Sequence, residues 1–310
     1  MVPVIKTCQV RKKFKRSLAV NQASLTVCEG DIYGLIGQNG AGKTTIMRLI
    51  MGHIFPSSGS LEIMGRADLR GLIEGRKKIG ALIEVPSIIP NMSSEENLQY
   101  TKRLYGIREN RVQEILKLVS LDSSRTKKAR YLSLGMKQRL AIGNCLLIRP
   151  KVLLLDEPMN GLDPQGIVEI RNLLLQLNQK NNTTILISSH ILSELEQVAT
   201  KYAFIHNGEL IEEINKNELM QKCETYIRIK SVDAAKIKIL LEEKINLLDS
   251  IAVSDAEIQI HGSNHLFNQI QNCLSENKIA YHHMSIQSAS LEEYYMKKTG
   301  GQKHEKPYEI

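Results

Sequence analysis

The sequence of 310 residues contains no apolar run long enough to cross a membrane, which takes about 18 uninterrupted apolar residues. Its longest apolar runs, such as VLLLD at residues 152–156, suit buried strands instead. The N-terminal stretch MVPVIKTCQVRKKFKR also lacks the long apolar segment of a signal peptide. We therefore expect a soluble or peripheral protein, and we expect any membrane-spanning function to belong to another chain.

Cysteine is equally sparse. The sequence contains five cysteines, which form no CxxC pair and no spacing typical of metal ligands. Because their number is odd, we expect reduced thiols of the kind found in the cytosol. The sequence also shows no internal repeat, no heptad pattern and no low-complexity segment.

The charge balance is basic, with a formal net charge of +8, and apolar residues make up 42% of the chain. This apolar fraction is sufficient for a buried core. An excess of cations favours an anionic partner such as a nucleotide, a nucleic acid or a lipid surface. A mildly basic, solvated surface would give the same composition. Composition alone therefore leaves the partner open.

Residues 1–218 alternate between strand and helix patterns, which is typical of an α/β domain. A helix is expected from near Gly42 to Gly52, where glycine ends it. Residues 93–150 are mainly helical and begin with a Ser-x-x-Glu capping pattern, and another helix covers residues 166–179. The dipeptide Asn207-Gly208 predicts a hairpin. The predicted strands cover residues 4–10, 24–27, 31–36, 60–64, 79–83, 151–155 and 183–188.

The pattern changes near residue 219. Residues 219–299 predict strands and helices in the order β-α-β-β-α-β, followed by a last helix at LEEYYMKK. This order is that of the ferredoxin-like fold. We therefore predict a small C-terminal α+β domain at residues 219–299, and a flexible tail at residues 300–310.

The strongest functional motif is GQNGAGKT at residues 37–44, which matches the G-x-x-x-x-G-K-[ST] phosphate-binding loop (P-loop) in full. The predicted strand IYGLI precedes it and a predicted helix follows it. Its glycines allow backbone N–H groups to turn toward an anion, and the helix N-terminus adds its dipole. Lys43 can reach the β- and γ-phosphates, and Thr44 can coordinate Mg²⁺. The predicted nucleotide-binding residues of this stretch are Gly37, Gln38, Asn39, Gly40, Ala41, Gly42, Lys43, Thr44 and Thr45.

A second motif, KVLLLDEP at residues 151–158, is an apolar strand that ends in two carboxylates. Asp156 would lie at the end of the strand and hold Mg²⁺, as in P-loop NTPases. Glu157, one residue further on, could polarise the attacking water. An acidic cap between strand and loop would look the same by itself. Beside the P-loop, however, the functional interpretation is favoured.

A third motif, YLSLGMKQRL at residues 131–140, places Ser133 and Gly135 just before a helical pattern. A hydroxyl and free N–H groups at a helix start form an anion site. With the acidic strand a short way beyond it, this motif resembles the signature of ATP-binding cassette proteins. Over residues 1–218 the chain resembles the ATP-binding subunits of ABC transporters. In that family the signature caps the γ-phosphate held by a second protomer. The resemblance therefore implies a homodimer, or a pair with another cassette subunit, with ATP at the interface.

The resemblance also gives roles to three further residues. Phe14 resembles the aromatic residue that stacks on adenine, although ordinary packing would also explain it. Asp163, in NGLDP, resembles the loop residue that meets the opposite P-loop. His190, after TTILISS, resembles the switch histidine that contacts the γ-phosphate, where a lone histidine would otherwise be structural. With Glu157, His190 would form the catalytic pair.

Two departures from the family pattern stand out. The usual signature is Leu-Ser-Gly-Gly-Gln, whereas this chain has Leu134 and Met136 in place of a glycine and the glutamine. The loop glutamine of most such ATPases is replaced by Glu84. An ionised glutamate can coordinate Mg²⁺ but cannot donate a hydrogen bond. The resemblance therefore implies that Glu84 is a ligand of the metal and nucleotide, and the alternative is an ordinary exposed carboxylate.

These departures, together with LEEYYMKKTGG near the C-terminus, resemble the bacitracin-resistance and lantibiotic self-protection branch of the family. The resemblance implies an ATPase with ATP and Mg²⁺ as cofactors, attached peripherally to the cytoplasmic face of the cell membrane. A helical subdomain at about residues 85–150 would contact a separate membrane permease. The implied function is to power the export of a peptide antibiotic.

Two other functions remain open. The net charge of +8 would permit a soluble cassette ATPase that acts on ribosomes or DNA. Ribosomal members usually carry two cassettes in one chain, and DNA-repair members carry long coiled coils, neither of which is found in this sequence. Leu134 and Met136 would also suit a nucleotide-sensing module with little turnover.

Overall fold

The computed structural model describes residues 2–15, 17–85, 87–222, 225–245, 250–254, 256–261, 264–288 and 291–299. The chain separates into two compact units, Met1–Lys216 and Asn217–Ile310. The sequence analysis placed this boundary at residue 218. The predicted flexible tail at residues 300–310 lies outside the described residues.

The first unit is built around a six-stranded sheet. Its strands are β4 (Ile32–Ile36), β6 (Ile79–Leu82), β7 (Val152–Asp156), β8 (Thr184–Ser189), β9 (Lys201–His206) and β10 (Glu209–Asn215). They follow the order β10-β9-β4-β8-β7-β6, and all neighbours are parallel except β9 and β10, which form the hairpin predicted at Asn207-Gly208. Every residue of β4, β7 and β8 is buried. Burial on both faces explains the continuous apolar runs of β4 and β7.

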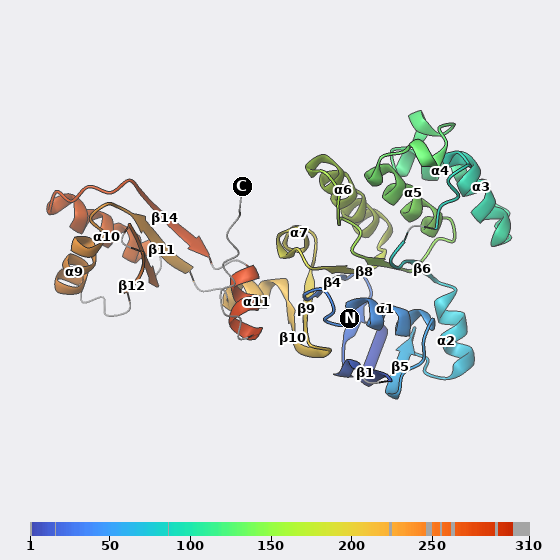
Figure 1. Ribbon diagram of the computed structural model, residues 1–310, viewed down its shortest axis with the longest axis horizontal. Coiled ribbons are helices and arrows are strands. Elements are labelled where there is room, and N and C mark those ends of the chain that lie inside the picture. The colour runs from blue at the N-terminus through green and yellow to red at the C-terminus, as the bar shows by residue number, and fades with distance from the viewer. Residues whose placement is uncertain are drawn as a thin grey trace. The chain divides into compact units, whose positions relative to one another are not determined.

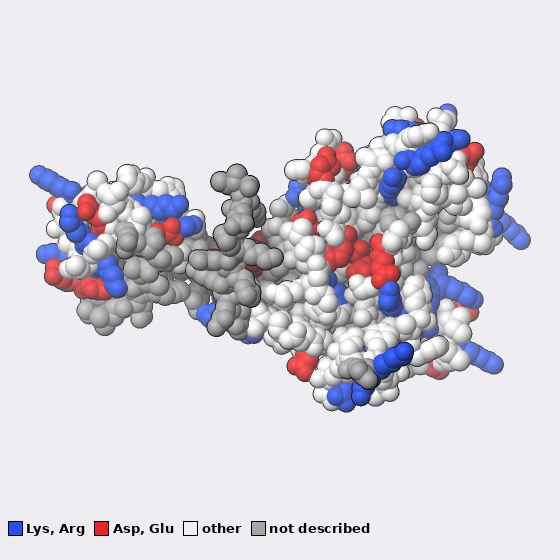
Figure 2. All heavy atoms as spheres, viewed as in Figure 1, with Lys and Arg blue, Asp and Glu red and all other residues white. Residues whose placement is uncertain are grey.

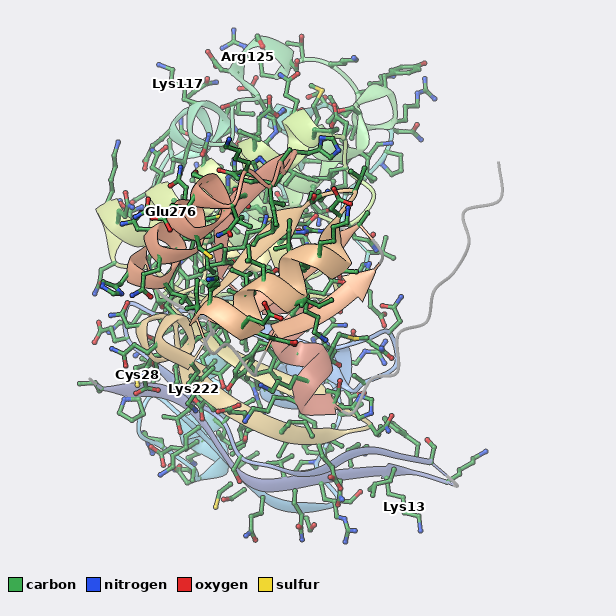
Figure 3. All side chains as sticks on the ribbon, turned by 90° about the vertical axis from the view of Figure 1, so that its left-hand side faces the viewer. Lys13, Cys28, Lys117, Arg125, Lys222 and Glu276 are labelled. Carbon is green, nitrogen blue, oxygen red and sulfur yellow. The ribbon has the colours of Figure 1, made fainter. Side chains whose placement is uncertain are left out.

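A second, antiparallel sheet completes the unit. It contains β1 (Pro3–Phe14), β2 (Ser17–Ala23), β3 (Thr26–Cys28) and β5 (Ser58–Ile63). The predicted first strand ended at residue 10, and no strand was predicted at residues 17–23; both expectations were wrong. Most of the residues from 11 to 18 are charged or exposed in an extended hairpin, so they lack the apolar alternation that marks a strand. Lys13 lies near the tip of this hairpin (Figure 3).

Helix α1 (Lys43–Met51) lies between the two sheets, and α6 (Pro164–Asn181) and α7 (Leu192–Glu196) lie on the other face of the six-stranded sheet (Figure 1). The buried side chains of α1 belong to one core with residues of both sheets. As predicted, α1 ends at Gly52, which is left-handed with φ of 75°. Three short helices, α2 (Leu69–Arg76), α7 and α8 (Lys216–Lys222), were not predicted.

The region from residue 85 to residue 150 is mainly helical. It contains α3 (Ser94–Leu104), α4 (Val112–Leu118), α5 (Leu134–Leu146) and the 3-10 turns η1 (Asp122–Ser124) and η2 (Ala129–Tyr131). The capping box predicted at the start of α3 is present. Ser93 accepts a hydrogen bond from the N–H of Glu96, and the Glu96 carboxylate accepts one from the N–H of Ser93. None of the helices in the described part of the chain is long and apolar enough to span a membrane.

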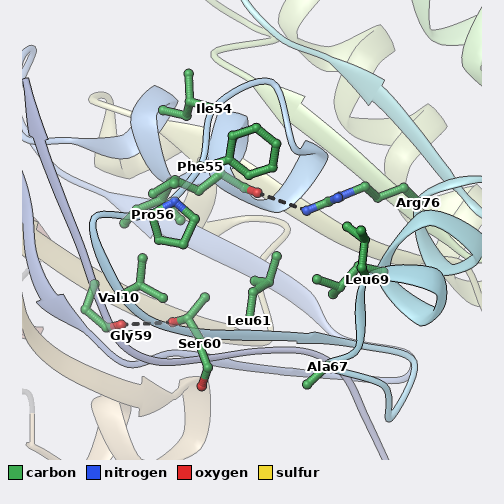
Figure 4. A pocket seen from close by; sticks show the side chains of 15 residues that line it. Val10, Ile54, Phe55, Pro56, Gly59, Ser60, Leu61, Ala67, Leu69 and Arg76 are labelled. Carbon is green, nitrogen blue, oxygen red and sulfur yellow. Dashed lines mark hydrogen bonds between the residues drawn. The ribbon is translucent and has the colours of Figure 1, made fainter.

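An apolar pocket of about 270 Å³ lies in the first unit, between α1, α2, β1 and β5 (Figure 4). Phe55, Leu69 and Arg76 line it, and the Arg76 guanidinium donates to the carbonyl of Ile50 at the end of α1. No residue of the P-loop lines this pocket. It is therefore separate from the phosphate-binding site.

The second unit contains a four-stranded antiparallel sheet. Its elements are β11 (Thr225–Lys230), α9 (Ala234–Ile245), β12 (Ser250–Ser254), β13 (Glu257–His261), α10 (Asn264–Glu276), β14 (His283–Ser288) and α11 (Leu291–Thr299). The strands follow the order β12-β13-β11-β14, so β13 separates β11 from β12. Isoleucines of β11 and β13 share a core with α9 and α10. This topology confirms the predicted split βαβ, ferredoxin-like fold.

Candidate active site

The P-loop at residues 37–44 connects β4 to α1, in the context that the motif requires. Gly40 and Gly42 have φ of 83° and 108°, which side-chain-bearing residues rarely adopt. A Cβ atom at Gly37 would lie 2.5 Å from the carbonyl oxygen of Ile205, and one at Gly42 would lie 2.6 Å from that of Ala19. Backbone approaches this close permit only glycine at both positions.

Lys43, the first residue of α1, is held inside this loop. Its side chain is only 5% exposed, and its Nζ donates to the carbonyls of Gly37 and Gln38 at 2.6 and 3.2 Å. The same Nζ lies 3.0 Å from Oε1 of Glu157. A buried ammonium needs such partners because its desolvation is costly. The cation is thus fixed at the loop, in position to meet a phosphate.

The two carboxylate oxygens of Asp156 accept hydrogen bonds from hydroxyl groups of two different elements. Thr44 Oγ1 donates to its Oδ2 at 2.8 Å, and Ser188 Oγ donates to its Oδ1 at 2.6 Å. Asp156 ends β7, and Ser188 is its register partner on β8. The sequence analysis missed Ser188. The available signal was a serine pair immediately before His190, at the end of the strand predicted at residues 183–188.

Glu157 and His190, the predicted catalytic pair, are in direct contact. His190 Nδ1 lies 2.7 Å from Oε2 of Glu157, and the other carboxylate oxygen faces Lys43. Glu157 has φ of 50°, which turns its backbone away from the strand direction at the end of β7. The carboxylate therefore bridges the imidazole of one loop and the ammonium of another.

The oxygen ligands at this point suit a magnesium ion. Mg²⁺ prefers oxygen and is usually held by one or two carboxylates together with substrate phosphates. Thr44 and Asp156 provide a hydroxyl and a carboxylate 2.8 Å apart. Within the described residues, no group of three or more His, Cys, Asp or Glu side chains could hold a metal ion. The Thr44 hydroxyl and the Asp156 carboxylate fit Mg²⁺ as ligands, and its binding here remains a prediction.

Glu84 lies in the loop after β6 and has φ of 64°. It forms an ion pair with Arg48, which is one helical turn beyond Thr44 in α1. A hydrogen bond from Arg48 to this carboxylate raises the pKa of Arg48. Both side chains are well exposed, at 37% for Arg48 and 51% for Glu84. The structure therefore connects this loop to the helix that carries Thr44.

The signature residues and Asp163 both start helices. Ser133 caps α5 and accepts from the N–H of Met136 at 3.3 Å, and Asp163 caps α6 and accepts from the N–H of Gly166 at 3.2 Å. A Cβ atom at Gly135 would lie 3.8 Å from Cα of Gly166. The N-termini of α5 and α6 are therefore neighbours, so the two predicted contact loops belong to one surface.

Phe14 ends β1, close to the hairpin tip marked by Lys13 in Figure 3. Its side chain is 41% exposed, and Lys12 Nζ lies 5.0 Å above the ring centroid. Such a cation–π contact leaves part of the ring surface open. The ring is thus available for stacking, and its contact with adenine remains a prediction.

One buried carboxylate near the site was also missed. Glu194, in α7, is 9% exposed, and its Oε2 lies 3.5 Å from the hydroxyl of Ser189. Burial raises the pKa of Glu194, while the hydrogen bond from Ser189 acts in the opposite direction. The negative charge of Glu157 also raises it. Glu194 therefore belongs to the electrostatic surroundings of the catalytic pair.

A parallel sheet with a glycine-rich loop after β4, and an acidic β7 end facing that loop, defines a P-loop NTPase. The comparisons with known proteins agree and give the family. The model of the ABC transporter family matches residues 20–160. The chain is 38% identical to the bacitracin transport ATP-binding protein BcrA of Bacillus licheniformis, over 97% of this chain and 99% of that protein. It is also 38% identical to the lantibiotic transport ATP-binding protein SrtF of Streptococcus pyogenes, over 67% of this chain and 89% of that protein.

Solved structures show the same fold. The dimeric, post-hydrolysis ATP-binding cassette MJ0796 bound to ADP and Pi matches with a TM-score of 0.61 and 25% identity, over 68% of this chain and 98% of that one. The ADP-bound cassette MJ1267 matches with a TM-score of 0.63 and 25% identity, over 71% and 94%. The chain therefore belongs to the ATP-binding proteins of ABC transporters, which bind and hydrolyse ATP. This confirms the resemblance inferred from the three motifs.

Proposed function

We propose that this protein is the ATPase subunit of an exporter that removes a peptide antibiotic of the bacitracin or lantibiotic type. Similarity to BcrA along nearly the whole chain, including the second unit, supports this cargo class. The contact of Lys43, Glu157 and His190 at one point supports the chemistry. The contact of these three residues is the observation that carries the ATPase part of the proposal, because it places Lys43, which would bind phosphate, beside Glu157, the proposed base.

In this proposal the P-loop amides and Lys43 bind the nucleotide phosphates. Thr44 and Asp156 would hold Mg²⁺, with Glu84 as a further ligand from the neighbouring loop, and the ion would supply positive charge to the phosphates. The Glu157 carboxylate orients the attacking water and accepts its proton. His190 holds Glu157 through Nδ1 and contacts the γ-phosphate. Phe14 stacks on the adenine ring.

We further propose that two copies close head to tail on ATP. Ser133 and the free amides near Gly135, at the start of α5, would bind the γ-phosphate held by the partner, and Asp163 would meet the partner's P-loop. The dimeric relative MJ0796 supports this assembly. Leu134, which is well exposed beside Ser133, would lie at the interface.

The permease would dock in a groove between β6, α3 and α5. This groove has a volume of about 630 Å³ and includes Ile83, Val85 and residues 87–89 of the loop after β6. Its apolar lining suits a short amphipathic helix of a membrane protein. Because Glu84 lies inside this loop, movement of the loop would couple the metal site to the permease. Docking would place the chain peripherally at the cytoplasmic face of the cell membrane. The groove is lined by Ile83, Val85, Ile89, Tyr100, Leu104 and Tyr105, among others.

Neither alternative function gains support from a specific observation. A nucleic-acid-binding protein concentrates cations on one face. On the face shown in Figure 2, Lys and Arg of the first unit are interspersed with Asp and Glu. A nucleotide sensor with little turnover would not need Glu157 and His190 in contact. The turnover measurement described next separates it from an ATPase.

The test uses Glu157→Gln in the full chain with saturating ATP and Mg²⁺. Turnover should stop and an ATP-bound dimer should accumulate, as measured by light scattering after gel filtration. Adding Ser133→Arg to this variant should return it to the monomer. A strictly monomeric Glu157→Gln protein, even with its permease, would refute the proposed assembly. Wild type that turns over no faster than Glu157→Gln when assembled with the permease would refute the transport function.

The cargo needs a separate test. Deleting the gene in its host should lower resistance to bacitracin or to a lantibiotic. Unchanged resistance to all of these antibiotics would contradict the cargo class while leaving the ATPase assignment intact.

A further inference from the structure

Ser188 is the one residue of β8 whose side chain contacts both members of the Asp156-Glu157 pair. It is fully buried, with 0% of its surface exposed. Its hydroxyl lies 2.6 Å from Oδ1 of Asp156 and 3.0 Å from the backbone nitrogen of Glu157. Ser188 itself reaches no solvent and lies behind the carboxylates, so it cannot contact the nucleotide.

The hydrogen-bonding capacity of a hydroxyl fixes the direction of both contacts. A serine hydroxyl has one proton to donate. The Glu157 N–H is a donor, so Ser188 Oγ must accept there and direct its proton to Asp156. The bond to Asp156 is short and charge-assisted, and such bonds are about twice as strong as neutral ones. With Thr44 on Oδ2 at 2.8 Å, both oxygens of the Asp156 carboxylate have a fixed partner.

The second contact stabilises an unusual backbone conformation. Glu157 has φ of 50°, a left-handed value that is strained for a residue with a side chain. Its N–H turns to the Ser188 hydroxyl. An unpaired buried N–H would add a further penalty. Ser188 therefore supports the turn that lets the Glu157 carboxylate reach both Lys43 and His190.

We propose that Ser188 is a positioning residue for ATP hydrolysis. One hydroxyl sets the rotation of the Asp156 carboxylate and the backbone turn of Glu157, so metal ligand and base keep a fixed relative geometry. This inference rests on the proposed roles of Asp156 and Glu157. Lys43 keeps its hydrogen bonds to the carbonyls of Gly37 and Gln38 without Ser188, so ATP binding should survive the loss of Ser188 while turnover and metal affinity fall.

The test compares three variants of the full chain. Ser188→Ala removes the hydroxyl, and Ser188→Cys keeps a similar volume with a much weaker donor and acceptor. Thr184→Val is the matched control, because Thr184 is also buried on β8 and its hydroxyl accepts from the N–H of Gly30, away from the carboxylates. Each variant is measured for kcat, for the Kd of a fluorescent ATP analogue, for Mn²⁺ affinity by electron paramagnetic resonance with ADP present, and for Tm.

Loss of a group that orients a metal ligand typically lowers metal affinity or activity about 10–100-fold. Ser188→Ala and Ser188→Cys should show a loss of this size in kcat and a weaker Mn²⁺ affinity, with the nucleotide Kd within about threefold of wild type. Thr184→Val should lower Tm and leave kcat within about twofold.

Three results would overturn the inference about Ser188. In the first, Ser188→Ala keeps wild-type kcat and Mn²⁺ affinity. In the second, kcat and nucleotide affinity fall together. In the third, Thr184→Val loses kcat as strongly as Ser188→Ala. Glu157→Gln, measured in the same series, distinguishes a failure of the proposed role of Glu157 from a failure of the proposed role of Ser188. If Glu157→Gln keeps full turnover, the proposed role of Glu157 is wrong, whereas an inactive Glu157→Gln beside a normal Ser188→Ala refutes only the role of Ser188.

Discussion

His190 Nδ1 lies 2.7 Å from Oε2 of Glu157, although the two residues belong to loops that follow different strands, β8 and β7. The parallel pairing of these strands brings their carboxyl ends to the same edge of the sheet. A second carboxylate contact, to Lys43 at 3.0 Å, comes from the P-loop. The loop after β7, the loop after β8 and the P-loop meet at the Glu157 carboxylate, so its orientation depends on all three segments.

This convergence leads to a prediction about His190. His190→Ala should lower kcat by about 100-fold, because loss of an orienting or proton-handling group typically costs 10²–10⁴-fold. The affinity for ATP should change much less, since Lys43 and the loop amides remain. The measurement is steady-state ATPase activity alongside nucleotide binding. His265→Ala, at an exposed position of α10, is the matched control. A His190→Ala protein with wild-type kcat would show that the contact is incidental.

The Arg48–Glu84 ion pair leads to a prediction about the loop that follows β6. Both side chains are exposed, so the pair contributes about 0.2–1 kcal/mol at most, and Arg48→Met should barely change stability. The loop that follows β6 should nevertheless move when Arg48→Met removes this ion pair. The chain contains no tryptophan, so Val85→Trp would place a single reporter beside Glu84. Without nucleotide, adding Arg48→Met should shift its emission toward that of Val85→Trp with ATP and Mg²⁺.

The control for this experiment is Lys77→Met, which removes another exposed ion pair, between Lys77 at the C-cap of α2 and Glu74 in the same helix. It should leave the emission of the reporter unchanged. Identical spectra for Val85→Trp with and without Arg48→Met would mean that the ion pair does not hold the loop.

The raised pKa of Glu194 leads to a prediction that the difference in stability between wild type and Glu194→Gln depends on pH. Burial raises its pKa in the folded protein. The folded state therefore holds this proton more tightly than the unfolded chain, whose glutamate pKa is about 4.3. Its contribution to stability is complete below that value and is lost as the pH rises through the folded pKa. Glu194→Gln stays neutral, so its Tm should exceed that of wild type at pH 8 by more than at pH 4.5.

Thermal unfolding at the two pH values measures this effect, and each kcal/mol corresponds to about 2–4 °C for a unit of this size. Glu196→Gln is the control, because Glu196 is exposed on the same short helix. A gain in Tm that is equal at both pH values, or larger at pH 4.5, would contradict the assigned cause.

The sequence was sufficient to predict the P-loop and the acidic strand, because each is a continuous segment whose residues act together. Ser188 could not be predicted in this way. Its role depends on the register between β7 and β8, which places it beside Asp156, and register is a tertiary property. The contact of Arg48 with Glu84 likewise depends on packing between α1 and a loop distant in sequence.

Helix α2 shows why some elements were missed. Its sequence LRGLIEGR contains two glycines, which disfavour a helix. A Cβ atom at Gly75 would lie 2.5 Å from Cγ2 of Ile63 in β5. Close packing against the sheet thus requires glycine where local propensity opposes it. Similarly, the second unit was predicted because its apolar alternation follows the strands and helices closely, whereas the charged β1–β2 hairpin lacks such a pattern.

The cysteines give a final prediction, on thiol reactivity. Burial raises the pKa of Cys145 to about 12, and its thiol donates to the carbonyl of Ala81 in β6 at 3.4 Å. At pH 8 the reactive thiolate is therefore roughly one part in ten thousand. Cys8, in contrast, is exposed on β1. Cys145 is partly exposed and lines the groove between β6, α3 and α5, so its raised pKa rather than complete burial should limit its reactivity. N-ethylmaleimide should therefore label Cys8 of the folded protein much faster than Cys145, as read by mass spectrometry of the peptides. Labelling of Cys145 at the rate of Cys8 in the folded protein would show that the pKa of the Cys145 thiol is not raised.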